Sequence, residues 1–150
     1  MTELLRLENV SKAFGGIKAV SNVSFGLNEG EIVGLIGPNG AGKTTLVNLI
    51  TGVHPLSGGK VIFKGNDVSK QKPYQAARAG LARTFQVVQP FPEMTVFENV
   101  AAGALFGGGG DSIAEASERT HEELAFVGLD TLSDTPAASL TLPNRKRLEL

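Results

Sequence analysis

The sequence contains no cysteine, which excludes disulfide bonds, a thiol nucleophile and a cysteine-ligated metal. An excess of one charge is also missing, because 14 Lys and Arg residues stand against 15 Asp and Glu residues, for a net charge of −1. This balance argues against binding to nucleic acid by bulk electrostatic attraction, and we expect no nucleic-acid partner. No run approaches the ~20 apolar residues that span a bilayer, and no secretory signal is visible.

Glycine, in contrast, is abundant. The chain has 19 glycines among 150 residues, nearly twice the usual ~7%. They follow no collagen-like period, so we expect them to serve backbone geometry at particular places. Hydrophobic residues make up 41% and charged residues 19% of the chain, an ordinary globular balance.

The first third of the chain is typical of strands. Leu5 and Leu7 alternate with polar residues, as do the apolar residues of 23–27, which predicts half-exposed strands of an antiparallel sheet. Residues 32–36 form a short apolar run without alternation and predict a strand covered on both faces. Residues 61–63 predict a further strand that turns at 64–67, and residues 82–85 another.

The apolar spacing then becomes helical. Leu46, Leu49 and Ile50 predict a helix closed by Gly52 and Pro55. Further helices are expected over 73–79, 95–104 and 111–127, with Gly128 ending the last of these, and from Pro143 onward, still running at Leu150. The run Gly107-Gly108-Gly109-Gly110 is interpreted as a flexible linker between two of these helices.

One motif carries chemistry: residues 37–44 match G-x-x-x-x-G-K-[ST], a phosphate-binding loop between an apolar segment and a helix. Gly37, Gly40 and Gly42 are expected to adopt positive φ, so that successive amides point inward at an anion. Lys43 supplies a charge for the β- and γ-phosphates, and Thr44 a hydroxyl for Mg²⁺.

Two further sequence features bear on the ligand of this loop. Thr45 adds a further hydroxyl after the motif. The dinucleotide fingerprint G-x-G-x-x-G is absent, which argues against an NAD site.

The stretch Gly37-Pro38-Asn39-Gly40-Ala41-Gly42-Lys43-Thr44-Thr45 resembles the Walker A motif of ABC-transporter ATPases. By the same resemblance, Phe14 matches the aromatic residue that stacks on adenine. Gln86 matches the Q-loop glutamine, which contacts Mg²⁺ and the attacking water and signals to the membrane domains. Residues 91–100 are similar to the segment that opens the helical subdomain, and residues 127–129 to the approach to the signature motif.

The resemblance implies an α/β P-loop NTPase of ABC type, with an antiparallel β subdomain, a P-loop core and a helical subdomain. It implies a partial domain over 1–150, in which 1–86 hold the β subdomain and core and 87–150 the helical subdomain. Lys43 and Gln86 are the implied catalytic residues, and Thr44 and Gln86 the implied metal ligands. Residues 37–45 and Phe14 are the implied contacts to ATP, with Mg²⁺ as the second cofactor.

The segments 83–86 and 94–99 most resemble ATPases of branched-chain amino acid importers. The implied function is an ATP-binding and hydrolysing subunit at the cytoplasmic face of the inner membrane. Its implied partners are transmembrane permease subunits, a second ATP-binding subunit and, indirectly, a periplasmic solute-binding protein. The transported solute cannot be read from the chain.

The sequence also departs from the family. Leu140-Thr141-Leu142-Pro143-Asn144 stands where L-S-G-G-Q is expected, and Pro143 has no N–H to offer a phosphate. An apolar strand ending in Asp-Glu and a switch histidine do not occur. We therefore expect a fragment that ends before the Walker B strand, leaves the strand at 32–36 with an open edge, and binds nucleotide but hydrolyses it poorly.

Two alternatives stay open. One is a soluble ABC ATPase of translation or DNA repair, which the charge balance disfavours. The other is a different P-loop enzyme, although the Asn-Lys-x-Asp guanine reader of GTPases is absent. His54 and His121 are interpreted as structural residues, and Arg145-Lys146-Arg147 as a solvated helix face.

Overall fold

The computed structural model describes residues 2–107 and 112–150, so the predicted linker residues 108–110 lie outside the described part of the chain. The chain divides into two compact units, Met1–Ala76 and Ala77–Leu150. Helix α2 (Pro73–Arg78) contains the division between them.

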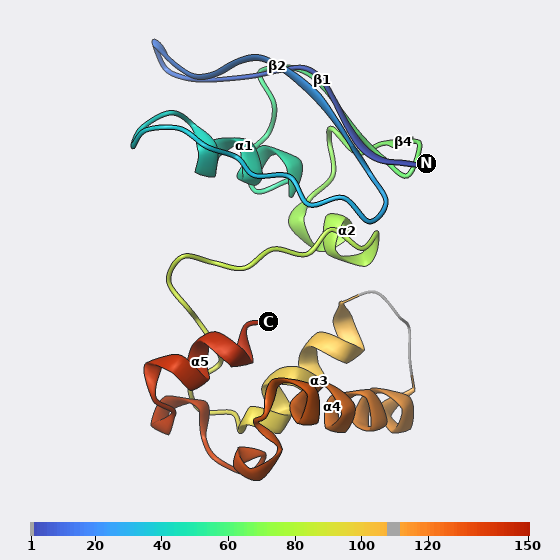
Figure 1. Ribbon diagram of the computed structural model, residues 1–150, viewed down its shortest axis with the longest axis vertical. Helices are drawn as coiled ribbons and strands as arrows, with labels where there is room; N and C mark the ends of the chain where they lie inside the picture. The colour runs from blue at the N-terminus through green and yellow to red at the C-terminus, as the bar shows by residue number, and fades with distance from the viewer. Residues whose placement is uncertain (1, 108–111) are drawn as a thin grey trace. The chain divides into compact units, whose positions relative to one another are not determined.

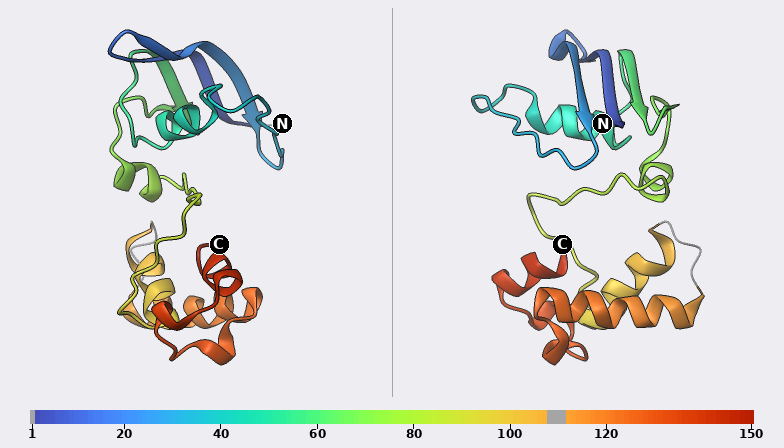
Figure 2. Two further views of the ribbon diagram at one scale, coloured as in Figure 1. Left: turned by 90° about the vertical axis from the view of Figure 1, so that its left-hand side faces the viewer. Right: turned by 45° about the vertical axis from the view of Figure 1, so that its right-hand side comes forward.

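The first unit is built on a four-stranded antiparallel sheet. Its strands are β1 (Glu3–Phe14), β2 (Ile17–Asn28), β3 (Gly58–Phe63) and β4 (Asn66–Asp67), in the order β2-β1-β3-β4. Helix α1 (Lys43–Ile50) lies against one face of this sheet (Figures 1 and 2). The core consists of alternate strand residues and the inward face of α1, including Leu5, Leu7, Val10, Val61, Phe63, Leu46 and Leu49. The predicted antiparallel strands and the helix after the glycine cluster are confirmed.

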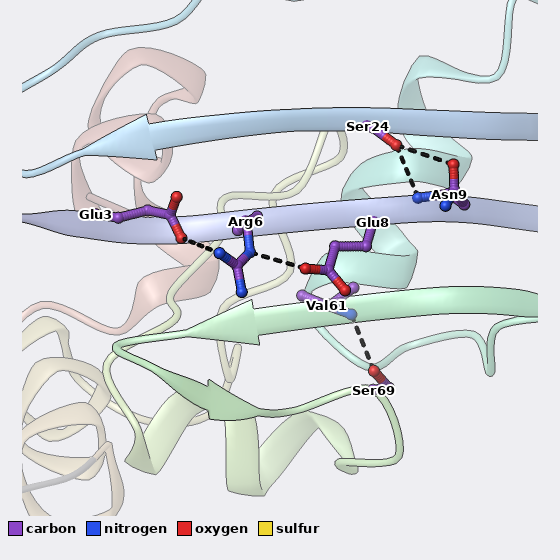
Figure 3. Close-up of polar contacts among 7 residues, drawn as sticks. All are labelled: Glu3, Arg6, Glu8, Asn9, Ser24, Val61 and Ser69. Atoms are coloured by element: carbon purple, nitrogen blue, oxygen red, sulfur yellow. Dashed lines mark hydrogen bonds and ion pairs between the residues drawn. The ribbon is translucent and has the colours of Figure 1, made fainter.

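The long hairpin of β1 and β2 is irregular at two facing places. Asn9 and Asn22 both have a φ of 50°, and the strand register shifts nearby. Serine hydroxyls replace the lost ladder bonds: Ser24 Oγ accepts from the Asn9 N–H at 2.8 Å (Figure 3), and Ser11 Oγ accepts from the Asn22 N–H at 2.9 Å. These bulges let the hairpin bend while its backbone stays hydrogen-bonded.

Figure 3 also shows how the exposed side of the sheet is held. Arg6 lies between Glu3 at 3.5 Å and Glu8 at 3.0 Å, and Ser69 Oγ accepts from the Val61 N–H at 2.9 Å. The ion pairs are exposed and contribute little, whereas the Ser69 bond ties the segment after β4 to β3.

The prediction of a buried strand at 32–36 is wrong. These residues have no regular secondary structure, and Ile32 and Ile36 are 100% and 95% exposed. An apolar sequence becomes a strand only beside another strand that accepts its backbone hydrogen bonds. Within the described residues the sheet ends at β2 on one side and β4 on the other, and no strand lies beside residues 32–36. The predicted open-edged central strand is therefore absent as well.

The second predicted strand that does not form is 82–85. These residues are also without regular structure, and Phe85 is exposed. Local β propensity again fails to make a strand, because the described residues provide no strand beside this segment.

The second unit is helical. It contains α3 (Val96–Phe106), α4 (Ile113–Val127), the 3₁₀ turns Asp130–Leu132 and Ala137–Ser139, and α5 (Leu142–Leu148). Its core is formed by buried Val96, Leu124, Leu129 and Leu140, with Phe97, Val100, Val127, Leu132 and Leu148 packed around them. Helices α3 and α4 pack against each other in this unit. Helix α5 ends at Leu148, so the prediction that it still runs at Leu150 is wrong.

The helix ends follow from local chemistry. Thr95 with Glu98 and Ser112 with Glu115 form capping boxes at the starts of α3 and α4. Gly128 ends α4 in the left-handed conformation, with a φ of 68°. No helix in residues 2–107 and 112–150 is both long and apolar enough to cross a bilayer.

Candidate functional site

The predicted phosphate loop lies immediately before α1. Gly40 and Gly42 have φ values of 83° and 82°, as predicted, and Gly42 is the residue from which α1 begins. A Cβ on Gly42 would lie 2.2 Å from the Ala19 carbonyl oxygen of β2, so only glycine fits between the helix and the sheet.

Gly37 differs from its prediction. Its φ is not positive, and its lack of a side chain has another reason: a Cβ there would lie 3.2 Å from the Cβ of Ala41. Glycine at this position lets the start of the loop approach its own end.

Lys43 closes the loop on itself. Its ammonium donates to the carbonyl oxygens of Gly37 at 2.6 Å and Pro38 at 2.8 Å, and the Ala41 N–H donates to the Pro38 oxygen at 3.2 Å. Two main-chain dipoles therefore hold the charge against the loop backbone, where an anionic ligand can compete for it.

The other predicted contacts surround the start of the helix. Pro38, Asn39, Gly40 and Ala41 are exposed, Thr44 is exposed in the first turn of α1, and Thr45 is half-buried. The first amides of α1 have no partner within the helix and lie at its positive end. Exposed amides, a hydroxyl and an ammonium thus lie within one stretch of eight residues.

Phe14 is the last residue of β1, and its side chain is 44% exposed. The His54 ring contacts it edge-on, with the ring centroids 5.4 Å apart and the planes at 81°. The Lys12 ammonium lies 5.0 Å from the Phe14 centroid and donates to the Pro55 carbonyl oxygen at 2.7 Å. The contact between His54 and Phe14 is not predictable from the sequence, because no local spacing links residues 14 and 54.

Gln86 belongs to the second unit, whereas Lys43 and Thr44 belong to the first. The side chain is exposed. The segment before it is held within its own unit: the Arg83 guanidinium carbon lies 4.1 Å from the Phe85 ring centroid, and the Phe85 N–H donates to the Glu149 carboxylate.

The segment in the place of the signature motif precedes and begins α5. Thr141 is the N-cap residue and Pro143 lies in the first turn, a position that needs no N–H donor. The interpretation of Arg145 as part of a solvated face is wrong. Its guanidinium donates to the carbonyl oxygens of Leu140 at 3.0 Å and Ala138 at 2.5 Å, which lie in and just after the 3₁₀ turn Ala137–Ser139.

Comparison with known proteins places this geometry in a family. The family model described as "ABC transporter" matches residues 20–150, which include the whole phosphate loop.

The chain belongs to the ABC transporter family.

Relatives within this family are similar over nearly the whole chain. The probable branched-chain amino acid transport ATP-binding protein LivG of Archaeoglobus fulgidus is 37% identical over 160 residues, covering 99% of this chain and 62% of that protein. The high-affinity LivG of Salmonella typhimurium is 39% identical, covering 98% and 63%. The arabinose import ATP-binding protein AraG of Ralstonia nicotianae is 35% identical, covering 100% and 30%. The chain therefore spans less than two thirds of the length of these ABC transporter relatives.

Solved structures agree with the sequence matches. The ADP conformation of an ATP-binding cassette of an ABC transporter has a TM-score of 0.84 at 36% identity, covering 99% of this chain and 63% of that one. The dimeric structure of a bacterial ABC transporter cassette has a TM-score of 0.82 at 26% identity, covering 97% and 67%. The predicted ABC ATPase fold is confirmed.

Proposed function

We propose that this chain is the nucleotide-binding part of an ATP-hydrolysing subunit of an ABC importer, one that energises uptake of branched-chain amino acids or a similar small solute. The observation that carries the proposal is the loop before α1, where Gly40 and Gly42 take positive φ and Lys43 is held over the loop carbonyls. The 36–39% identity to branched-chain amino acid transport ATP-binding proteins supports the choice of solute class.

In the proposed function the phosphates of ATP take the place of the Gly37 and Pro38 carbonyls as partners of Lys43. The ammonium then neutralises phosphate charge, and the free amides at the start of α1 donate to the same oxygens. Phe14, exposed at the end of β1, offers its ring to adenine. Asn39, Ala41 and Thr45 are further proposed contacts to ATP.

Mg²⁺ fits the proposed site in part. The exposed Thr44 hydroxyl, in the first turn of α1, is a hard oxygen ligand next to the phosphate loop. Mg²⁺ usually takes only one or two protein ligands and completes its shell with phosphate oxygens and water. When bound, it would supply charge neutralisation at the phosphates, with Thr44 and Gln86 as the proposed protein ligands.

ATP hydrolysis needs more than binding of the phosphates by the loop. Within the 150 residues there is no Asp-Glu pair after an apolar strand, the arrangement that the family resemblance associates with Mg²⁺ and the general base. General-base and electrostatic contributions each lower a reaction barrier by several kcal/mol. We propose that the 150-residue chain binds ATP and hydrolyses it poorly, with Lys43 and Gln86 acting in catalysis in the complete protein.

The proposed partners are transmembrane permease subunits, a second ATP-binding subunit and, indirectly, a periplasmic solute-binding protein. One of the similar solved cassettes is a dimer, which supports pairing of two ATP-binding subunits. We place the protein at the cytoplasmic face of the inner membrane, bound to the permease. No nucleic-acid partner is proposed, because the net charge of −1 provides no basic surface excess.

Sugar import is the competing solute class, because the arabinose import relative is 35% identical. Co-purification from a native membrane decides between these classes: a permease that takes up leucine, isoleucine or valine supports the proposal. A sugar permease contradicts the solute assignment, and ribosomes or DNA would favour the soluble ABC ATPase instead.

A competition experiment tests which nucleotide the chain binds. Labelled ATP bound to the chain should be displaced by unlabelled ATP at lower concentration than by GTP. Preference for GTP, or turnover as fast as in intact transporter ATPases, would contradict the proposal.

A further inference from the structure

Phe14 is held by one contact from its own strand and by one from a segment far along the chain. It closes β1 beside a turn at Gly15 and Gly16 and pairs with Ile17 across the hairpin. Neither Phe14 nor Ile17 is buried, with 44% and 74% of their surfaces exposed. A half-exposed ring at a hairpin end samples several side-chain rotamers, and stacking a base on it requires one of them to be fixed.

Two side chains contact the Phe14 ring. His54 meets it edge-on, at 5.4 Å between centroids and 81° between planes, the arrangement that aromatic quadrupoles favour. The Lys12 ammonium lies 5.0 Å from the ring centroid and is itself held by the Pro55 carbonyl oxygen at 2.7 Å. Backbone contact adds a third link, because the Ala13 N–H donates to Ser57 Oγ at 3.1 Å.

The segment that contains His54, Pro55 and Ser57 is anchored to α1. The N–H groups of Val53 and His54 donate to the Asn48 carbonyl oxygen, at 2.8 and 3.2 Å, in the last turn of that helix. The phosphate loop leads into the other end of the same helix, eight residues and about 12 Å away. The ring and the loop are therefore attached to opposite ends of one rigid element.

We propose that His54 and Lys12 are positioning residues that brace the Phe14 ring against the α1 helix, and so set the distance at which adenine can stack while its phosphates lie in the 37–44 loop. This inference rests on the proposed function, because it requires Phe14 to stack on the base. It adds that base recognition depends on two residues that touch the ring rather than the nucleotide.

The brace predicts a selective loss of binding. Variants of His54 or Lys12 should lose affinity for ATP, which needs the ring, and keep affinity for inorganic tripolyphosphate, which needs only the loop. We expect Kd for ATP to rise about tenfold or more in Phe14→Ala. The expected rise is about threefold to tenfold in His54→Ala and about twofold to fivefold in Lys12→Met. Kd for tripolyphosphate should change less than about twofold in all three variants.

The chain offers matched controls for both contacts. His121 also lies against a phenylalanine, Phe97, at 5.0 Å, but in the helical unit. Lys64 lies 5.2 Å from the centroid of Phe63, far along β3 from the hairpin end. His121→Ala and Lys64→Met remove the same kinds of contact elsewhere and should leave Kd for ATP unchanged.

The experiment is a titration of the 150-residue chain with ATP and with tripolyphosphate by isothermal calorimetry, with circular dichroism of each variant to confirm the fold. If His54→Ala does not fold, His54→Gln carries the same test. His54→Tyr keeps an aromatic edge and should restore ATP binding to within about twofold of wild type. Combining His54→Ala with Phe14→Ala should add no further loss, because His54 acts through the ring.

The outcomes separate the brace from the proposed function. If Phe14→Ala weakens ATP binding while His54→Ala and Lys12→Met do not, the brace is wrong and the proposed role of Phe14 stands. Equal loss of ATP and tripolyphosphate in His54→Ala also contradicts the brace, because that pattern reports damage to the loop through α1. Unchanged ATP binding in Phe14→Ala overturns the role of Phe14 and the brace together.

Discussion

Asn99 holds both polar groups of Phe91. Its Oδ1 accepts from the Phe91 N–H at 2.8 Å, and its Nδ2 donates to the Phe91 carbonyl oxygen at 3.1 Å and to the Thr95 carbonyl oxygen at 2.8 Å. One side chain on α3 thus fixes the turn that leads into that helix.

Removing this amide should destabilise the helical unit. We expect Asn99→Ala to lower the free energy of unfolding by about 0.5–1.5 kcal/mol, because it removes the side-chain hydrogen bonds while the Phe91 and Thr95 carbonyl oxygens keep their backbone donors Met94 and Asn99. Urea unfolding followed by circular dichroism measures the change. Gln89→Ala removes an exposed amide from the same unit and should change stability by less than about 0.5 kcal/mol. Equal effects of the two substitutions would show that the Asn99 contacts contribute nothing.

Two glycines of the phosphate loop share the same backbone angle and differ in their surroundings. Both have positive φ. A Cβ on Gly42 would lie 2.2 Å from the Ala19 carbonyl oxygen, whereas a Cβ on Gly40 would have no atom within 4 Å. Gly40→Ala should cost about 1–2 kcal/mol of backbone strain. Gly42→Ala should cost at least about 2 kcal/mol more, because the start of α1 must move away from β2. The unfolding free energies of the two variants test this difference, and similar values would contradict the close packing of α1 on the sheet.

The start of α4 depends on its capping box. The Ser112 hydroxyl accepts from the Glu115 N–H at 3.3 Å, so Ser112→Ala should lower the free energy of unfolding by about 0.5–2 kcal/mol. Ser117→Ala is the matched control, because Ser117 lies inside the same helix, away from the cap. Thermal unfolding that ranks Ser117→Ala as the more damaging substitution would rule out the cap as the source of stability.

The same box makes stability depend on pH. Hydrogen bonds from the Ser112 backbone N–H and then from its side chain lower the pKa of Glu115 below its ordinary value of 4.5. The stabilisation by the carboxylate is therefore complete above pH 4.5 and is lost as the pH falls through the lower pKa of the folded state. Glu115→Gln should lose less stability than wild type on acidification over that range. Identical acid unfolding curves for the two proteins would contradict the lowered pKa.

The elements whose sequence signals are local are predictable from the sequence. Alternation located β1 and β2, and the loop motif with its following apolar spacing located α1. The capping residues Thr95 and Ser112 lie next to the predicted starts of α3 and α4. Residues 32–36 were mispredicted because an apolar run records a preference for burial, whereas a strand also needs a neighbouring strand.

In the candidate site, too, only the features with local sequence signals are predictable. Lys43 and the positive φ of Gly40 and Gly42 follow from eight consecutive residues. The contact between His54 and Phe14 joins residues 40 apart in sequence, and the bonds from Arg145 to Leu140 and Ala138 depend on how a 3₁₀ turn leaves its carbonyls. Contacts of this kind have no periodic signature, so they appear only once the chain is folded.

The central claim is that residues 37–44 bind the phosphates of ATP through Lys43. The most direct measurement is the Kd for Mg·ATP of wild type, Lys43→Ala and, as a matched exposed lysine of the same unit, Lys60→Ala. We predict saturable binding by wild type and by Lys60→Ala, and a Kd at least about tenfold higher in Lys43→Ala, because a charge-assisted contact to phosphate is lost. Failure of the wild-type chain to bind ATP, or equal affinity in Lys43→Ala, would contradict the account.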